Sequence, residues 1–124
     1  MPELLQSYSE VFDIGLALKS VGDDPEFLAE IVGLTHAAWP TLLTNIREAV
    51  SRGDLRAFSN SARLAKAAAR NVSARRAYDC ALQLCSMAHK GDLQAARTGI
   101  TLLEREVEML CTCLATVEED ACPS

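Results

Sequence analysis

LQAARTGITLLEREVEMLCTCLATV, Leu93–Val117, carries the clearest helical repeat in this chain, and it decides the fold class. Its apolar positions are separated by 3, 4, 3, 4, 3, 4 and 3 residues. Side chains at these spacings fall on one face of an α-helix, as in the seam of a helical bundle. The stretch therefore predicts a long helix that packs against other helices. The seam residues are Leu93, Ala96, Ile100, Leu103, Val107, Leu110, Leu114 and Val117.

Two turn sequences of the same kind separate predicted helices. Arg52-Gly53-Asp54-Leu55 and Lys90-Gly91-Asp92-Leu93 each place a glycine directly before an aspartate. The glycine can end one helix in a left-handed conformation, and the aspartate can cap the next helix. Turns this short make the flanking helices antiparallel neighbours.

The rest of the chain shows helical periodicity and no sustained strand alternation. Gly22-Asp23-Asp24-Pro25 reads as a helix stop, a cap and a proline in the first helical turn. Pro40 lies inside the helix that follows, where it removes a backbone donor and predicts a bend. A shorter N-terminal helix is expected before that stop. Two further helices are expected between the helix that contains Pro40 and the one at Leu93–Val117. The expected helices are Leu4–Ser20, Pro25–Ser51, Asp54–Arg70 and one that Ser73 caps and that ends near His89.

The predicted fold is all-α: an antiparallel up-down four-helix bundle with an additional short N-terminal helix packed against one end. Apolar spacing also predicts which side chains face the core of two helices. For Pro25–Ser51 they are Phe27, Ile31, Ala38, Leu42, Ile46 and Ala49. For Asp54–Arg70 they are Leu55, Phe58, Ala62, Ala65 and Ala69.

Length and composition indicate one globular domain spanning residues 1–124, with its core at about 10–118 and a flexible tail at 119–124. The chain has 124 residues, of which 49% are hydrophobic and 23% are charged. Such a chain can bury a sizeable core and does not have the composition of a disordered protein. No segment resembles a signal peptide, and the nearly apolar run Met109–Val117 is too short to span a bilayer. We therefore expect a soluble, cytoplasmic protein.

Five cysteines raise the question of a disulfide or a metal site. Cys111 and Cys113 are two residues apart, so on a helix they point in different directions and cannot share one metal ion. Cys80 and Cys85 are five apart, and Cys122 lies near the C-terminus. An odd number of cysteines without a secretion signal favours reduced thiols that pack as small core residues. No metal and no cofactor is expected.

Charge is strongly segregated along the chain. The segment Arg47–Arg76 carries a net charge of +6, whereas the rest of the chain carries −11. Within this segment, one side of the helix predicted at Asp54–Arg70 is basic. We call this side, together with the asparagine that follows it, the basic face. Most charged helix faces are merely solvated, but here consecutive alanines lower the surface beside the charges and give a partner access to it. The basic face consists of Arg56, Asn60, Arg63, Lys66, Ala67, Arg70 and Asn71.

The stretch around the basic face resembles the histidine-containing phosphotransfer (HPt) domain, a four-helix bundle that passes phosphoryl groups between receiver domains. In that family a helix opens with Asp-Pro-Glu and two apolar residues, as in Asp24-Pro25-Glu26-Phe27-Leu28 here. The next helix follows a Gly-Asp turn, as at Gly53-Asp54, and carries Ala-His-x-Leu-Lys-Gly, then Asn, an aliphatic residue, Gly and Ala. The resemblance covers Phe12 to Ala115. The matching positions are Ala62, Lys66, Asn71, Val72 and Ala74.

The chain departs from the family at the chemical centre. Arg63 stands where the family has its phosphoacceptor histidine, and Ala65 stands where it has leucine. Ala67 and Ser73 replace two glycines. A guanidinium stays cationic up to about pH 12 and has no free lone pair to attack a phosphoryl group. The resemblance therefore implies a degenerate HPt protein that binds a receiver domain or a histidine kinase through the basic face without accepting phosphate.

Other functions are less consistent with the sequence. The basic face could bind nucleic acid or another anionic partner, but it lacks interleaved aromatic residues and the whole chain is acidic. An enzyme is not expected, because there is no Ser-His-Asp set, no glycine-rich phosphate loop and no metal-ligand cluster. His36 and His89 are expected to be structural or surface residues. A monomer is expected, and a dimer through the helix with Cys111 and Cys113 is left open.

Overall fold

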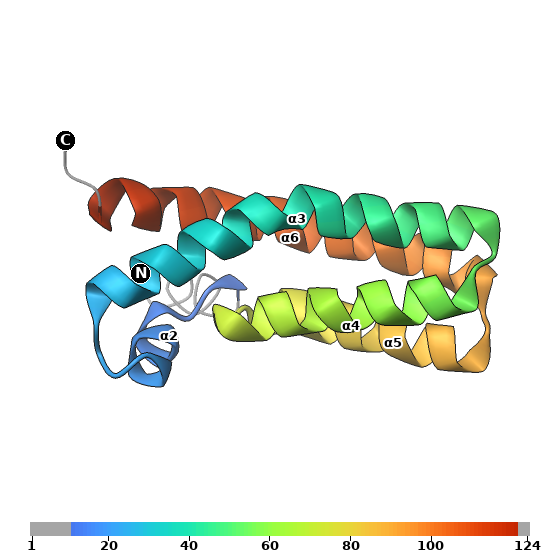
Figure 1. Ribbon diagram of the computed structural model, residues 1–124, viewed down its shortest axis with the longest axis horizontal. Coiled ribbons are helices and arrows are strands. Elements are labelled where there is room, and N and C mark those ends of the chain that lie inside the picture. The colour runs from blue at the N-terminus through green and yellow to red at the C-terminus, as the bar shows by residue number, and fades with distance from the viewer. Residues whose placement is uncertain (1–10, 122–124) are drawn as a thin grey trace, which may run out of the picture.

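The computed structural model describes residues 11–121, with the burial of residues 11–115. Within this range every regular element is a helix and no strand occurs, so the predicted all-α class is confirmed. Figure 1 shows the arrangement of the helices. They are α2 (Ile14–Ser20), α3 (Pro25–Arg52), α4 (Leu55–Asn71), α5 (Arg75–Lys90) and α6 (Leu93–Ala121).

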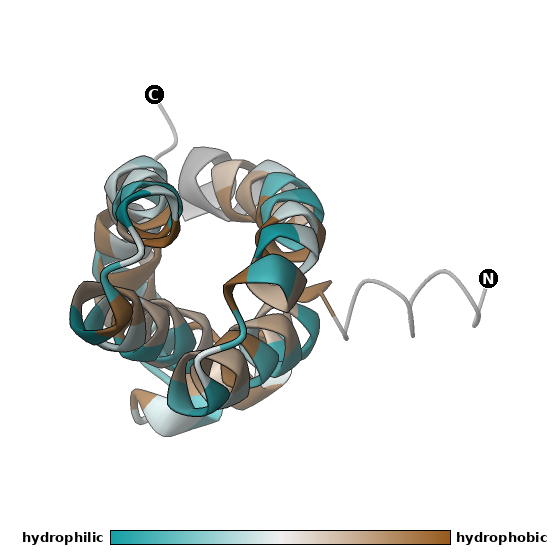
Figure 2. Cartoon of the chain, turned by 90° about the vertical axis from the view of Figure 1, so that its right-hand side faces the viewer, coloured by the Kyte–Doolittle hydropathy of each residue, from teal (hydrophilic) through white to brown (hydrophobic). Residues whose placement is uncertain are grey.

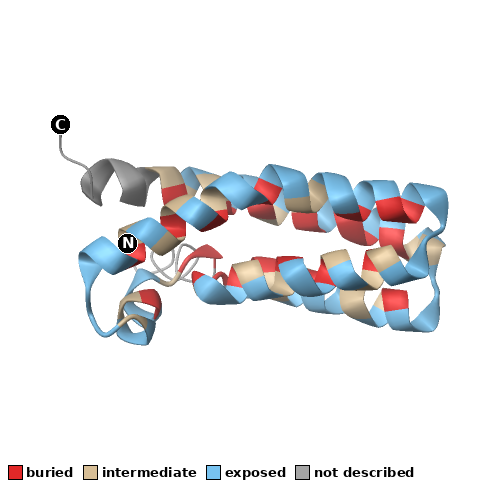
Figure 3. Cartoon of the chain, viewed as in Figure 1, coloured by how far each residue is buried: buried red, intermediate tan, exposed pale blue. Residues whose placement is uncertain are grey.

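The four long helices form a helical bundle around one core. Helix α3 packs against α4 and α6, and α5 packs against the same two helices. Figure 2 looks along the bundle and shows the four helices around a common axis. In Figure 3 the buried residues lie on the inner sides of the helices and the exposed residues on the outer sides. The short helix α2 contacts α3.

Both glycine–aspartate turns form as the sequence predicts. Gly53 and Gly91 have φ values of 69° and 71°, in the left-handed region where a side chain is unfavourable. Asp54 accepts a hydrogen bond from the backbone N–H of Ala57, with an N to Oδ1 distance of 3.1 Å. Asp92 is bonded in the same way to the N–H of Ala95, at 3.0 Å. These caps satisfy donors that the first turns of α4 and α6 would otherwise leave unpaired.

The predicted cap of α5 is wrong. Ser73 has a φ of 55° and ends α4 instead of starting α5. Its N–H donates to the carbonyl of Arg70 at 3.1 Å, and the N–H of Ala74 donates to the carbonyl of Ala69 at 2.9 Å. This pair of bonds is the Schellman motif, which closes a helix with a left-handed residue. Because Ser73 serves that end, α5 begins at Arg75 without a side-chain cap.

The expected helix Leu4–Ser20 is interrupted within its described part. The chain is not helical at Phe12 and Asp13, and α2 begins only at Ile14. The break arises because Asp13 takes the cap position, where its side chain accepts from the N–H of Leu16 at 3.0 Å. Residues 4–10 of the expected helix lie outside the described residues.

Helix α6 extends further than the predicted core. It runs to Ala121, three residues into the segment expected to be a flexible tail, and residues 122–124 lie outside the described residues. Six of its eight predicted seam residues are buried, from Ala96 to Leu114, and Leu93 is partly buried. The burial of Val117 lies outside the described range. Among the described residues, no helix combines the length and apolar character needed to cross a bilayer.

The predicted core face of α3 is only partly right. Phe27 is 48% exposed and Ala38 is exposed, while Ile31 and Leu42 are only partly buried. Ile46 and Ala49 are buried as predicted. In the N-terminal half the helix instead turns the neighbouring stripe inward, because this stripe carries the large indole of Trp39, which is fully buried. The residues buried there are Leu28, Val32, Thr35 and Trp39.

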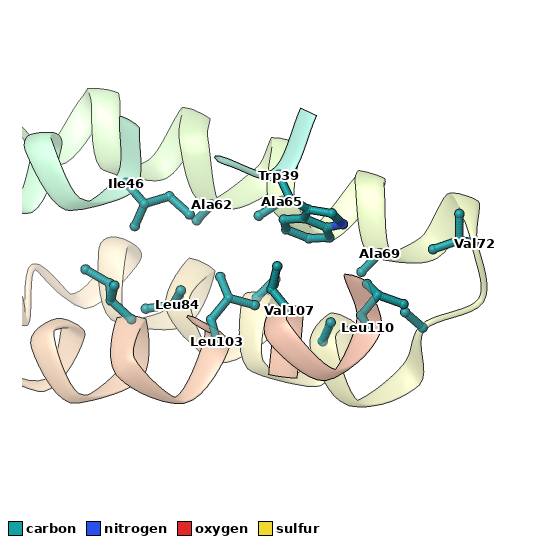
Figure 4. Close-up of a cluster of buried hydrophobic side chains, with 14 of the residues drawn as sticks. Trp39, Ile46, Ala62, Ala65, Ala69, Val72, Leu84, Leu103, Val107 and Leu110 are labelled. Carbon is teal, nitrogen blue, oxygen red and sulfur yellow. The ribbon is translucent and has the colours of Figure 1, made fainter. Parts of the chain in front are cut away.

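The predicted core face of α4 is mostly right. Phe58, Ala62, Ala65 and Ala69 are fully buried, whereas Leu55 is 41% exposed because it occupies the first position of the helix. Figure 4 shows Ala62, Ala65 and Ala69 of α4 facing larger side chains of the core. The indole of Trp39 enters between α4 and α6, alongside Ala65 and Ala69. Pro40 follows Trp39 within α3. In Figure 1 the N-terminal part of this helix runs at a slant to its C-terminal part, in agreement with the bend predicted at Pro40.

Candidate functional site

Helix α4 presents the basic face to solvent because its opposite face is committed to the core. The alanines at 62, 65 and 69 are fully buried, and residues on the far side of a helix of 3.6 residues per turn must then point outward. Six of the seven residues of the basic face are exposed, and Lys66 is half-buried. The structure thus brings all of the predicted partner-binding residues onto one accessible surface, with positive charge as its dominant property.

Arg63 lies at the middle of this surface and has a hydrogen-bond partner on its own helix. Its Nη2 donates to Oδ1 of Asn60 at 2.7 Å, one turn earlier. A bond between residues three apart holds the guanidinium along the surface of α4. The remaining donors of the guanidinium keep a planar arrangement that suits a carboxylate or a phosphate. The side chain at position 63 is therefore a hydrogen-bond donor without a nucleophilic lone pair.

Cys85 is a neighbour of the basic face that the sequence reasoning did not identify. It comes from α5, and burial raises the pKa of its thiol above the ordinary value. The positive charges of Lys66 and Arg63 lower this pKa and offset part of the rise. Since burial is the larger effect, the pKa of this thiol lies above its ordinary value, which disfavours the nucleophilic thiolate. Spacing alone did not show which side of α5 adjoins α4.

A surface groove continues the basic face toward the end of the bundle where α2 packs. Its volume is about 540 Å³. Leu16 of α2 and Tyr78 of α5 contribute apolar surface, while Arg70 and Arg75 bring positive charge. An apolar groove with cationic residues fits a protein segment that carries both apolar and acidic side chains.

The two histidines do not belong to this surface. His36 lies half-buried on α3, and His89 is exposed in the last turn of α5. Cys80, Cys85, Cys111 and Cys113 are half-buried. Among the side chains of residues 11–115, no three histidine, cysteine or acidic groups lie together so that they could hold a metal ion.

The candidate site therefore consists of the seven residues of the basic face, the thiol of Cys85 and the adjoining groove. It contains cationic donors and apolar surface, which suit the binding of an acidic protein surface. Comparison of the chain with protein-family models, with curated proteins and with solved structures found no significant match.

Proposed function

We propose that the four long helices form an antiparallel up-down four-helix bundle of the HPt kind, with α2 packed at one end. The order of packing supports this arrangement, because each long helix contacts two of the other three. The short turns at Gly53 and Gly91 also support it, because short connections favour antiparallel neighbouring helices. In such a bundle α4 would be the helix that carries the docking surface.

We further propose that the protein binds a receiver domain of a response regulator, or a histidine kinase, through the basic face and does not accept phosphate. The observation that carries this proposal is Arg63. It is exposed at the centre of the basic face and hydrogen-bonded to Asn60, at the position where the resembling family has its phosphoacceptor. Because a guanidinium is a donor without a nucleophilic lone pair, this surface is suited to docking and not to phosphoryl transfer.

The partner's chemistry follows from the charges. A receiver domain presents carboxylates around its phosphorylatable aspartate, and an arginine can pair with a carboxylate through two parallel hydrogen bonds. Lys66 and Arg70 follow Arg63 by three and seven residues, so they lie on the same side of α4 and widen the positive surface. Binding would occupy the acidic pocket and withhold it from other phosphotransfer partners.

Binding measurements test the docking role directly. Candidate receiver domains are titrated against the wild type, Arg63→Glu and the charge-matched control Arg105→Glu, which changes an exposed residue of α6. Arg63→Glu should weaken binding by about tenfold or more, since it replaces an attractive ion pair with a repulsive one. The control should leave affinity within about twofold. Equal binding of Arg63→Glu and the wild type would remove the role given to Arg63.

Phosphotransfer measurements test the absence of transfer. The wild type and Arg63→His are incubated with a panel of labelled phosphorylated receivers. The wild type should remain unlabelled, whereas the histidine variant should gain label if the docking surface is intact, because a neutral imidazole is a competent nucleophile near pH 7. Label on the wild type would contradict the proposal. Repeating the binding experiment with duplex and single-stranded DNA over a salt series checks the competing nucleic-acid function, for which affinity would fall steeply with salt.

A further inference from the structure

The N-terminal half of α3 carries a second apolar stripe that the bundle leaves largely exposed. Phe27, Ile31, Leu34 and Ala38 are separated by four, three and four residues, so they form one row along the helix. Phe27 is 48% exposed, and Leu34 is 74% exposed, the largest value among the exposed large hydrophobic residues of the described range. Ile31 is partly buried against the core. We call these four residues the α3 stripe.

The position of the α3 stripe explains its exposure. Figure 1 shows the N-terminal half of α3 extending past the end of α4. Helix α2 packs against α3, yet Phe27 and Leu34 stay exposed. From residue 27 to residue 38 the row is about 16 Å long at 1.5 Å per residue, which is three helical turns. That length suits a partner helix that inserts apolar side chains at matching intervals.

The charge around the α3 stripe restricts the kind of partner. Between Ser20 and Ile46 the chain has four acidic residues and no lysine or arginine. Glu30 lies four residues before Leu34 and three after Phe27, so it borders the row directly. Three more acids, Asp23, Asp24 and Glu26, precede the row at its N-terminal end. The stripe is thus apolar along its length and negative at its border.

A second copy of the chain is a poor occupant of this surface. In a symmetric pair the same patch faces itself, so the acidic borders of two α3 stripes would meet and repel. The basic face of α4 has the opposite charge, but it offers Ala67 and no large apolar side chain among its seven residues. The occupant needs large apolar side chains to cover the row and positive charge to face its acidic border. A helix with a large apolar row and flanking lysines or arginines has both.

We propose that the α3 stripe is a docking surface for an amphipathic helix with basic flanks, contributed by a partner protein. This surface is separate from the basic face of α4, so the molecule has two docking surfaces of opposite charge. With these two surfaces, one chain would hold an acidic partner on α4 and a basic helix on α3 at the same time.

The probe is a synthetic helical peptide with leucines at intervals of four, three and four residues and with flanking lysines. The comparison peptide keeps the leucines and has glutamates in place of the lysines. Fluorescence anisotropy measures the affinity of each peptide for the full chain. The lysine peptide should bind, with an affinity that falls as salt increases, and the glutamate peptide should bind at least about tenfold more weakly.

Variants locate the contact. Leu34→Ala should weaken binding of the lysine peptide by about tenfold or more, because it removes a large apolar contact without adding charge. Glu30→Gln should weaken it by about threefold and reduce its salt dependence. The matched control is Leu102→Ala, which changes a leucine of α6 that is 44% exposed, and it should have no effect. Arg63→Glu should also have no effect, and this separates the result from the function proposed for α4.

Several results would overturn the assignment. Equal affinity for both peptides, absence of binding, or binding that Leu34→Ala leaves unchanged would each contradict it. Sedimentation of the protein alone that shows a dimer dissociated by Leu34→Ala would assign the stripe to a second copy. Removal of residues 1–10 that strengthens peptide binding more than about tenfold would assign it to the chain's own N-terminal segment.

Discussion

Ser73 occupies a backbone conformation that favours glycine. Its φ of 55° lies in the left-handed region, where the side chain of an L-residue comes close to the following carbonyl. The fold requires this conformation, because the Ser73 position closes α4 and its carbonyl accepts a hydrogen bond from the N–H of Asp13 at 3.2 Å. The turn between α4 and α5 therefore holds local strain that the surrounding hydrogen bonds offset.

Ser73→Gly should stabilise the protein. Glycine adopts the left-handed conformation without the steric cost, and the gain should exceed the extra entropy that glycine loses on folding, giving a net increase of about 0.5 to 1 kcal/mol in the free energy of unfolding. Denaturant titration followed by the fluorescence of Trp39, the only tryptophan, measures the change. Ser59→Gly within α4 is the control and should destabilise by a similar amount. Loss of stability in Ser73→Gly would show that the serine side chain itself is required.

At the scale of elements, the closeness of α3 and α4 depends on small residues facing a large one. Ala65 and Ala69 of α4 are fully buried alongside the indole of Trp39, which is also fully buried. Interiors are packed too densely to accept additional methylene groups without movement. The small side chains of Ala65 and Ala69 therefore leave room for the indole.

Ala65→Leu should therefore destabilise the protein by about 1 to 3 kcal/mol through overpacking against Trp39. The double variant Ala65→Leu with Trp39→Leu should cost less than the sum of its single changes, by at least about 1 kcal/mol, because the two volume changes oppose each other. Urea unfolding followed by far-ultraviolet circular dichroism gives the four free energies. Ala67→Leu on the exposed side of α4 should change stability by less than about 0.5 kcal/mol. Strict additivity of the double variant would contradict the packing argument.

The contrast between α3 and α4 shows what periodicity can predict. In α4 a single apolar row faces a strongly charged side, so the core face and the exposed basic face could both be predicted from the sequence. The N-terminal half of α3 has two adjacent apolar rows, and which of them enters the core depends on where α4 ends and on the burial of Trp39. Both are tertiary facts that no local pattern contains. The hydrogen bond from Arg63 to Asn60 and the neighbouring thiol of Cys85 depend on tertiary placement and rotamers in the same way.

At the scale of the whole molecule, partial burial of cysteines makes the stability of the fold depend on pH. Burial is the largest cause of a raised thiol pKa at Cys80, Cys85 and Cys113, relative to an ordinary value of 9.0. The negative charges of Glu106 and Asp79 raise the pKa of Cys80 further, while Arg76 lowers it. Folding therefore makes all three thiols hold their protons to a higher pH than they do in the unfolded chain.

This difference should make the protein less stable in alkaline solution. Well below pH 9 the thiols are protonated in both states, so their full contribution to stability is present. As the pH rises above 9, the unfolded chain loses thiol protons before the folded chain does, and the free energy of unfolding falls until the folded thiols also ionise. Urea unfolding between pH 7 and pH 10.5 should show this decline. The triple variant with Cys80→Ala, Cys85→Ala and Cys113→Ala should show a flatter one, whatever its stability at pH 7. A direct check is the ultraviolet absorbance of the thiolates, which should rise at a higher pH in the folded protein than in urea. Superimposed titration curves would contradict the shift and, with it, the alkaline loss of stability assigned to these thiols.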